Sequence, residues 1–264
     1  MKRWEYKGRW ALVTGASTGI GEAFARSLAA RGMHLVLTAR REDRLRALTD
    51  ELTVAHGIRT HVIPLDLAEP GAPEEIWRQA ADGREIHLLV NNAGFGFQGA
   101  FHELPRDREV SVVQVNITAV LELAHLALQG MRARGEGGIL NVASVAAFQP
   151  LPTLATYAAS KAFVLYFSEA LWEENRRAGV RVVALCPGRT PTGFQERAGT
   201  GIVDRSTPGF KLPAEVAEAG LRALEKGRSY VIPGAVNYVN SFSGVLLPRQ
   251  LLMRMLGKLI RRFV

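Results

Sequence analysis

The stretch SVAAFQPLPTLATYAASK, residues 144–161, contains three side chains of types that suit proton transfer. Ser144 supplies a hydroxyl, Tyr157 a phenol and Lys161 an ammonium group. If residues 154–175 form one helix, Tyr157 and Lys161 lie one turn apart on the same face. A free phenol titrates at about pH 10, and a nearby ammonium favours its charged form. The spacing alone occurs often by chance, so the pair needs support from the rest of the chain.

Length and composition indicate a folded protein with a sizeable core. The 264 residues suffice for one large α/β domain or two small ones, and 47% of them are apolar. The single cysteine, Cys186, excludes an internal disulfide, and the six histidines show no ligand spacing, so we predict no metal site. We see neither an export signal nor about eighteen consecutive uncharged apolar residues. These features predict a cytoplasmic protein.

The net charge of +8 suits anionic ligands, which include nucleotide cofactors as well as nucleic acids. The chain has no zinc-finger spacing, no aromatic RNA-binding motif and no basic stripe interleaved with aromatic residues. We therefore predict that nucleic acid is not a partner.

Short apolar runs that alternate with longer amphipathic stretches predict the elements that must position these side chains. Seven runs have the composition of buried strands: WALVTG, HLVLTAR, THVIPLDL, IHLLVNNAG, GGILNVAS, VRVVALCPG and SYVIPG. Strands that alternate with helices and are apolar on both faces predict a parallel sheet with helices on each side. With no linker or repeat visible, we predict one domain over residues 1–248 and a helical extension over residues 249–264.

A glycine-rich segment, TGASTGIG, follows the first predicted strand and opens the first predicted helix. Glycines at such a turn let backbone N–H groups approach a pyrophosphate at the helix N-terminus. Their spacing differs from the common dinucleotide fingerprint, and a purely structural glycine turn is an equally good interpretation. The candidate cofactor-binding residues in this segment are Gly15, Ser17, Thr18, Gly19, Ile20 and Gly21.

The end of the second predicted strand indicates which cofactor is bound. Ala39 occupies the position where an acid would accept a hydrogen bond from a free ribose 2′-hydroxyl, and Arg40 and Arg41 follow it. Guanidinium groups suit a 2′-phosphate, so we predict NADP rather than NAD. The alternative is two solvated arginines at the start of a helix.

Polar residues follow the third and fourth predicted strands, at the same edge of the sheet. Asp66, with Leu67 beside it, ends the third strand, and the motif NNAG, with Asn92, Ala93 and Gly94, ends the fourth. We expect these residues to line the adenosine pocket. The local sequence fits simple turns equally well.

Considered together, these motifs identify a family. TGASTGIG, NNAG, Asn116, Ser144, Tyr157, Lys161 and PGRTPT occur in the order and at the spacings of the short-chain dehydrogenase/reductase family, which the chain resembles over about residues 8–235. The resemblance implies a single-domain α/β fold, a Rossmann-type doubly wound parallel sheet of about seven strands.

The resemblance also implies roles for individual residues. Tyr157 is expected to be the general acid in reduction, or the base in the reverse direction, and Lys161 is expected to bind the nicotinamide ribose and favour the phenolate. Ser144 would donate to the substrate oxygen. Asn116 resembles the residue that binds a water linking the lysine to solvent. The alternative for Asn116 is a polar helix residue that neighbours satisfy.

The segment CPGRTPT resembles the part of the family that contacts the nicotinamide amide. The expected contacts are Pro187, Gly188, Thr190 and Thr192, with Thr192 favoured by its spacing. Cys186 is more consistent with a packed strand residue than with a nucleophile. The region from Gly188 to about Leu212 is a candidate lid, with a plain surface loop as the alternative.

We therefore predict an oxidoreductase that moves a hydride between NADP(H) and a carbonyl or secondary alcohol, acting as a carbonyl reductase. The alternatives are a 3-oxoacyl-thioester reductase and a non-catalytic nucleotide-sensing protein of the same fold. The substrate is not identifiable, because Phe95, Phe97, Phe148 and Leu151 fit a core as well as a pocket wall.

The C-terminal segment LLPRQLLMRMLGKLIRRFV has apolar residues at helical spacing with cations largely between them. We favour packing of this amphipathic helix on its own domain or on a neighbouring subunit of a dimer or tetramer. Contact with an anionic membrane surface is the less favoured alternative.

Overall fold

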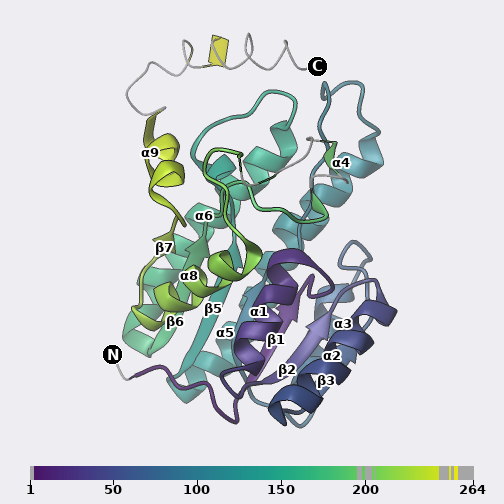
Figure 1. Cartoon of the computed structure of the whole chain (residues 1–264), viewed down its shortest axis with the longest axis vertical. Coiled ribbons are helices and arrows are strands. Elements are labelled where there is room, and N and C mark those ends of the chain that lie inside the picture. The colour runs from purple at the N-terminus through teal and green to yellow at the C-terminus, as the bar shows by residue number, and fades with distance from the viewer. Residues whose placement is uncertain are drawn as a thin grey trace.

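A single seven-stranded sheet forms the centre of the molecule (Figure 1). The computed structural model describes residues 3–194, 198–199, 204, 206–243, 250 and 253–254. All paired neighbours are parallel, and the strand order is β3-β2-β1-β4-β5-β6-β7. The strands are β1 Trp10–Thr14, β2 His34–Thr38, β3 Thr60–Ile63, β4 Ile86–Asn91, β5 Gly137–Val142, β6 Val180–Leu185 and β7 Tyr230–Val231. The predicted fold class is confirmed.

Helices cover both faces of this sheet. The core on one face includes α1, α2 and α8, and the core on the other includes α3, α5 and α6. The α-helices are α1 Gly19–Ala29, α2 Glu42–His56, α3 Ala72–Ala81, α4 Arg106–Val113, α5 Ala119–Arg134, α6 Ala155–Asn175, α8 Pro213–Glu225 and α9 Ala235–Ser243. A π-helical turn, Gln114–Thr118, joins α4 to α5, and short 3₁₀ helices span Val145–Phe148 and Arg176–Ala178.

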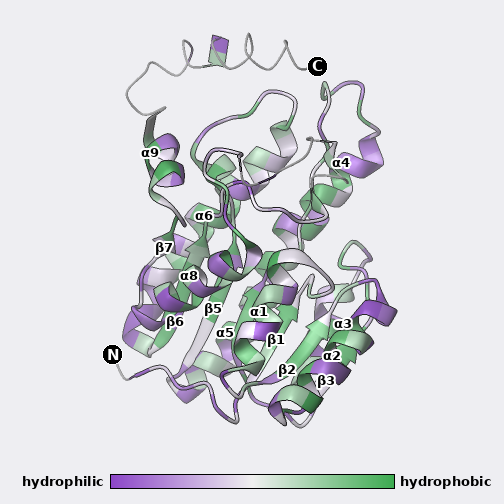
Figure 2. Ribbon diagram, in the orientation of Figure 1, coloured by the Kyte–Doolittle hydropathy of each residue, from purple (hydrophilic) through white to green (hydrophobic). Residues whose placement is uncertain are grey.

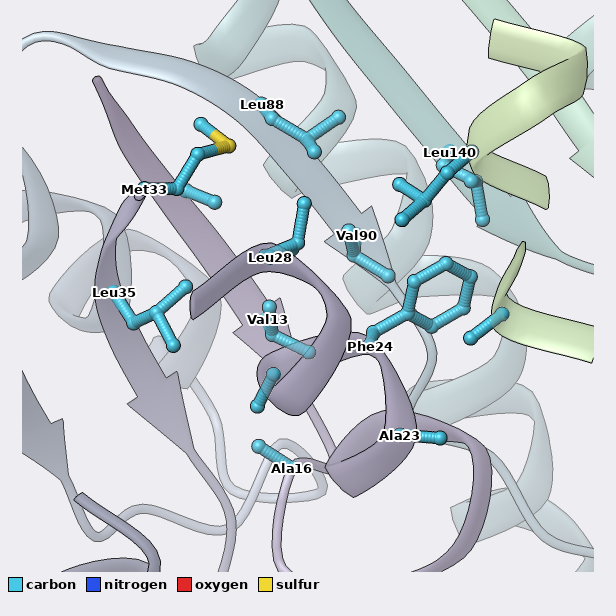
Figure 3. Close-up of a cluster of buried hydrophobic side chains, with 14 of the residues drawn as sticks. Val13, Ala16, Ala23, Phe24, Leu28, Met33, Leu35, Leu88, Val90 and Leu140 are labelled. Carbon is cyan, nitrogen blue, oxygen red and sulfur yellow. The ribbon is translucent and has the colours of Figure 1, made fainter. Parts of the chain in front are cut away.

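The strands are apolar on both sides because both faces are covered (Figure 2). In β1, Val13 belongs to the core beneath α1 and Leu12 to the core on the opposite face. Figure 3 shows Phe24 of α1 beside Val90 and Leu140. A Cβ on Gly220 of α8 would lie 3.1 Å from the Phe24 ring, so this glycine allows α8 to pack closely there.

The strand order creates a binding position at one edge of the sheet. Strand β1 has β2 on one side and β4 on the other, so the winding reverses between β1 and β4. In open α/β sheets, ligands bind beyond the carboxyl ends of the strands at such a point. The glycine-rich segment follows β1, and the NNAG motif begins at Asn91, the last residue of β4. The fold therefore brings both predicted nucleotide motifs to the same place.

The helical stretch Arg106–Arg134, which includes α4 and α5, is long and apolar enough to cross a membrane by length and composition. Our search for uncharged runs did not predict such a segment. Its residues Val115, Leu123 and Met131 are buried in the core against the sheet. The apolar character is thus accounted for by core packing.

Candidate active site

A cavity of about 930 Å³ lies at this edge of the sheet, within the size range of small-molecule sites. Most of the predicted site residues line it: Gly15, Ser17, Thr18, Ile20, Arg40, Arg41, Asp66, Leu67, Asn92, Ala93, Gly94, Ser144, Tyr157, Lys161, Pro187, Gly188, Thr190 and Thr192. Gly19, Gly21 and Asn116 do not line it. These three residues shape the surrounding structure.

The glycine-rich turn has the features required of a phosphate cradle. Gly15 has a φ of +64°, and a Cβ there would lie 2.9 Å from Ala93 Cα. A Cβ on Gly21 would collide with the Gly15 carbonyl oxygen. Helix α1 begins at Gly19, and the side chain of its N-cap residue, Thr18, makes no capping hydrogen bond. The first backbone N–H groups of the helix therefore have no side-chain acceptor at the end that faces the cavity. A dinucleotide pyrophosphate fits this position.

Thr14, which the sequence did not single out, joins the loops after β1 and β4. Its side chain is buried, and its hydroxyl oxygen accepts from the backbone N–H groups of Asn92 and Ala93, both at 3.0 Å. Asn92 Nδ2 donates in turn to the carbonyl oxygens of Thr14 and Gly15, at 2.9 and 3.2 Å. The sequence marks Thr14 only as a polar residue at a strand end, which is a weak signal.

The adenosine end of the cavity is exposed and loosely bonded. Arg40 Nη1 lies 3.5 Å from Asp66 Oδ2, and Arg41 Nη2 donates to Ser17 Oγ at 3.4 Å. Asp66 lies three residues beyond the end of β3 rather than on the strand, and its Oδ1 accepts from the Ala68 N–H at 3.0 Å. Asp66 therefore lines the cavity and also accepts a hydrogen bond within a turn, so the two interpretations of this residue are compatible.

The catalytic end of the cavity is built on α6 and β5. Tyr157 and Lys161 lie one turn apart on α6, as predicted, with Lys161 Nζ 5.8 Å from the centre of the Tyr157 ring. Lys161 Nζ donates to the Val142 carbonyl oxygen at 2.8 Å. Ser144 lies two residues past β5, where its Oγ accepts from the Ala146 N–H and also bonds the Tyr157 phenol. The three predicted chemical groups therefore meet.

The electrostatics of this end correct one expectation. Burial raises the pKa of Tyr157 above its ordinary value, and the hydrogen bond with Ser144 offsets this only in part. Burial also lowers the pKa of Lys161 to about 8. The expected net lowering of the Tyr157 pKa is not seen, because burial outweighs any contribution from the Lys161 ammonium. The Lys161 ammonium is directed at a carbonyl oxygen, and loss of water around the phenol dominates.

The side chain of Asn116 is held by its neighbours, and its expected role in binding a water stays a prediction. It lies in the π-helical turn, fully buried, and Nδ2 donates to the Phe95 carbonyl at 2.9 Å and to Ser160 Oγ at 3.0 Å. Its Oδ1 accepts from the Phe95 N–H at 3.1 Å. These contacts match the alternative interpretation, a helix residue that neighbours satisfy. The side chain fixes the loop after β4 rather than facing the cavity.

The segment after β6 faces the glycine-rich turn. A Cβ on Gly19 would lie 2.8 Å from the Thr192 side chain. Thr192 Oγ1 accepts from the Phe194 N–H at 3.3 Å, and Thr190 Oγ1 donates to the Gly188 carbonyl at 3.3 Å. Both threonines remain candidates for the nicotinamide contact. Much of the predicted lid, residues 195–197, 200–203 and 205, lies outside the described residues.

Cys186 is a packed strand residue, as the sequence indicated. It is fully buried, and burial raises the pKa of its thiol, which disfavours the thiolate.

The substrate end of the cavity has largely apolar walls. Phe95, Leu151, Leu154 and Phe194 line it, and the Phe194 ring centre is 5.1 Å from that of Tyr157. Phe97 and Phe148, which we weighed as wall residues, do not line the cavity. Phe97 packs on Phe95, and Phe148 packs on Tyr230 and Phe242. The sequence analysis missed Gln98, Thr153 and Phe194, because their loop positions depend on tertiary contacts.

Comparisons with known proteins agree with this geometry. A model of the short chain dehydrogenase family matches residues 9–202. The chain is 36% identical over 224 residues to the very-long-chain 3-oxoacyl-CoA reductase of Anas platyrhynchos. That alignment covers 83% of this chain and 72% of the relative.

Two solved structures are similar over nearly the whole chain. A short-chain dehydrogenase from Sphingobium yanoikuyae in complex with NADPH has a TM-score of 0.80 and 33% identity, with 93% of this chain and 95% of that chain covered. A bulky-bulky ketone specific alcohol dehydrogenase from Comamonas testosteroni has a TM-score of 0.76 and 32% identity, with 93% and 94% covered.

Proposed function

The chain belongs to the short-chain dehydrogenase family, and on that basis we propose that it reduces a carbonyl group to a secondary alcohol with NADPH. The observation that carries the proposal is the meeting of Ser144, Tyr157 and Lys161 in a cavity large enough for a nucleotide and a substrate. A phenol whose pKa is ordinary or raised is protonated at neutral pH, so Tyr157 carries the proton that reduction requires.

The chain's own residues provide proton transfer and orientation. NADPH supplies the hydride when bound. Ser144 holds the carbonyl oxygen by a hydrogen bond, and Tyr157 donates its phenolic proton to that oxygen as negative charge develops. The Lys161 ammonium, near the ring, then stabilises the phenolate that remains. Asn116 acts indirectly by holding the loop beside Tyr157.

NADP is proposed over NAD because of the charges at the adenosine end. Arg40 and Arg41 line the cavity, and their long contacts with Asp66 and Ser17 leave guanidinium donors available to a 2′-phosphate. No acid is present at Ala39. Support also comes from the Sphingobium relative, which was solved with NADPH.

A second candidate reaction is the reduction of a 3-oxoacyl thioester. The observation in its favour is the similarity to a very-long-chain 3-oxoacyl-CoA reductase, together with the apolar wall of Leu151, Leu154 and Phe194. A panel of ketones, aldehydes, steroids and 3-oxoacyl thioesters, assayed by NADPH consumption, tests both reactions. Efficient turnover of thioesters alone would favour the second candidate.

A non-catalytic nucleotide-sensing role is the alternative from another functional class. Such a protein would bind NADPH without consuming it on any member of the panel. The presence of Ser144, Tyr157 and Lys161 together at one cavity favours catalysis.

Association and location also remain proposals. The extension 249–264 lies outside the described residues except at Gln250, Met253 and Arg254. We favour its packing within a homo-oligomer in the cytoplasm, with nucleic acid excluded as a partner. Deleting it is expected to lower solubility or change the sedimentation coefficient. Salt-sensitive co-sedimentation of the full chain with anionic vesicles, lost on deletion, would instead support the membrane contact.

A further inference from the structure

Thr153 has an unusual backbone conformation at the substrate end of the cavity. Its φ is +66°, and it is the one non-glycine residue with positive φ in the described part of the chain. Threonine is β-branched, so this conformation is unfavourable unless the surroundings impose it. Strained backbone of this kind concentrates at ligand sites. Thr153 lines the cavity four residues before Tyr157, which makes a link to the substrate reasonable.

The Thr153 conformation joins two loops that both contribute to the cavity wall. The Thr153 carbonyl oxygen accepts from the Gly99 N–H at 2.9 Å. Gly99 belongs to the loop after β4, and Thr153 to the loop before α6. The neighbouring Gln98 N–H donates to the Ala198 carbonyl at 2.9 Å, which ties the same loop to the segment after β6.

The loop from Phe95 to Gly99 lies directly against the catalytic tyrosine. A Cβ on Gly96 would come 2.8 Å from the Tyr157 ring, so the backbone touches that ring. Asn116 holds one end of the loop through both backbone groups of Phe95. The Thr153 carbonyl holds the other end at Gly99. The two attachments together fix the distance between this wall and the wall of Leu151 and Leu154.

We propose that Thr153 determines substrate specificity as a positioning residue. Its left-handed backbone keeps the two loops close enough together for a bulky apolar carbonyl substrate to contact both. This inference rests on the proposed carbonyl reduction. A small ketone that reaches only Ser144 and Tyr157 does not need both walls. A large apolar ketone gains binding from both, so it depends on the Thr153–Gly99 contact.

Two substitutions separate the backbone effect from the side chain. Among the described residues, neither the Thr153 hydroxyl nor its N–H makes a hydrogen bond. Thr153→Gly therefore removes the side chain and keeps positive φ available. Thr153→Pro forces φ to about −65° and removes no recorded donor bond. The glycine variant is thus the matched control for the proline variant.

The measurement is the steady-state kinetics of both variants with 2-butanone and with a diaryl ketone. Thr153→Pro is expected to raise KM for the diaryl ketone by about tenfold or more, while kcat/KM for 2-butanone changes by less than about threefold. Thr153→Gly should resemble the wild type on both ketones. Equal losses in both variants, or an unchanged diaryl ketone KM in Thr153→Pro, would overturn the proposal.

A failure of the proposed function is distinguishable, because the wild-type enzyme would then reduce neither ketone. Hydrogen exchange of the Gly99 amide provides a readout that does not need turnover. Its protection should persist in Thr153→Gly and fall in Thr153→Pro. If the proline variant does not fold, judged by lost NADPH binding, Thr153→Asn joins Thr153→Gly in the test, since both residues tolerate positive φ. Loss of Gly99 amide protection in both of these variants would then contradict the proposal.

Discussion

The two ends of the cavity are built differently. At the adenosine end, the Arg40 side chain is 58% exposed and lies 3.5 Å from its carboxylate partner. At the catalytic end, Lys161 is only 4% exposed and donates at 2.8 Å, and Asn116 is completely buried with all its amide groups bonded. Exposed pairs contribute little because water screens them, whereas buried polar groups are costly to leave unpaired.

This difference suggests separate tasks for the two ends. The exposed charges at Arg40 and Arg41 influence which cofactor binds, and each should have a modest and salt-dependent effect. The buried groups at Tyr157 and Lys161 determine turnover, and their loss should have large effects. The expected sizes of four substitutions follow from this contrast.

The largest effect is expected from Tyr157→Phe. Removing the phenolic proton should lower kcat by about 10²- to 10⁴-fold, because a positioned general acid typically contributes that much. NADPH binding, measured by cofactor fluorescence, should change little. Tyr166→Phe, on the same helix but 65% exposed, is the control and should be near wild type. Near-wild-type turnover of Tyr157→Phe would contradict the mechanism.

Lys161→Met should reveal the buried ammonium through pH-dependent stability. The folded-state pKa of Lys161 is lowered from 10.5 to about 8, so the unfolded chain binds more protons between these values. The free energy of unfolding of the wild type minus that of the variant should therefore be constant below pH 8. Above pH 8 this difference should rise, by about 2 to 3 kcal/mol at pH 10. Urea unfolding of both proteins measures this. A difference independent of pH would show that Lys161 keeps an ordinary pKa.

Thr14→Val should destabilise the junction between the two nucleotide loops. The substitution keeps the shape and leaves the N–H groups of Asn92 and Ala93 without their acceptor. The free energy of unfolding should fall by about 2 kcal/mol, the cost of buried unsatisfied donors. Thr53→Val, at an exposed threonine, should change it by less than about 0.5 kcal/mol. Equal stability of the two variants would argue against this role of Thr14.

The smallest effect is expected at the adenosine end. Arg40→Ala should reduce the preference for NADPH over NADH by about tenfold or less, because an exposed charge-assisted contact is screened by solvent. The preference should also shrink as salt rises. Arg44→Ala, at an exposed arginine on α2, should leave the preference unchanged. Equal losses in both variants would indicate a general charge effect rather than a 2′-phosphate contact.

Sequence patterns predicted most of the fold and the groups that carry chemistry. Alternating strand and helix patterns predicted the parallel sheet. The family resemblance implied that Gly15, Ser144, Tyr157 and Lys161 share one site, and the structure places all four at one cavity. The pattern also indicated that Cys186 is packed.

What the sequence could not predict depends on tertiary contacts. Thr153 combines a positive φ with a carbonyl bond to the Gly99 N–H, and the local sequence reveals neither feature. Phe194 reaches Tyr157, whereas Phe148 packs away from the cavity, although both are phenylalanines near motif residues. The pKa of Tyr157 depends on burial, which spacing does not reveal. Such features require the packed structure.

The separation of the two ends can be measured directly with the double variant Arg40→Ala/Arg41→Ala and the single variant Tyr157→Phe. For each protein, the dissociation constants of NADPH and NADH are measured together with kcat at saturating NADPH. We predict that the double variant loses cofactor preference while kcat stays within about threefold, and that Tyr157→Phe loses kcat while the preference is kept. A double variant whose kcat at saturating NADPH falls as far as that of Tyr157→Phe would contradict the separation.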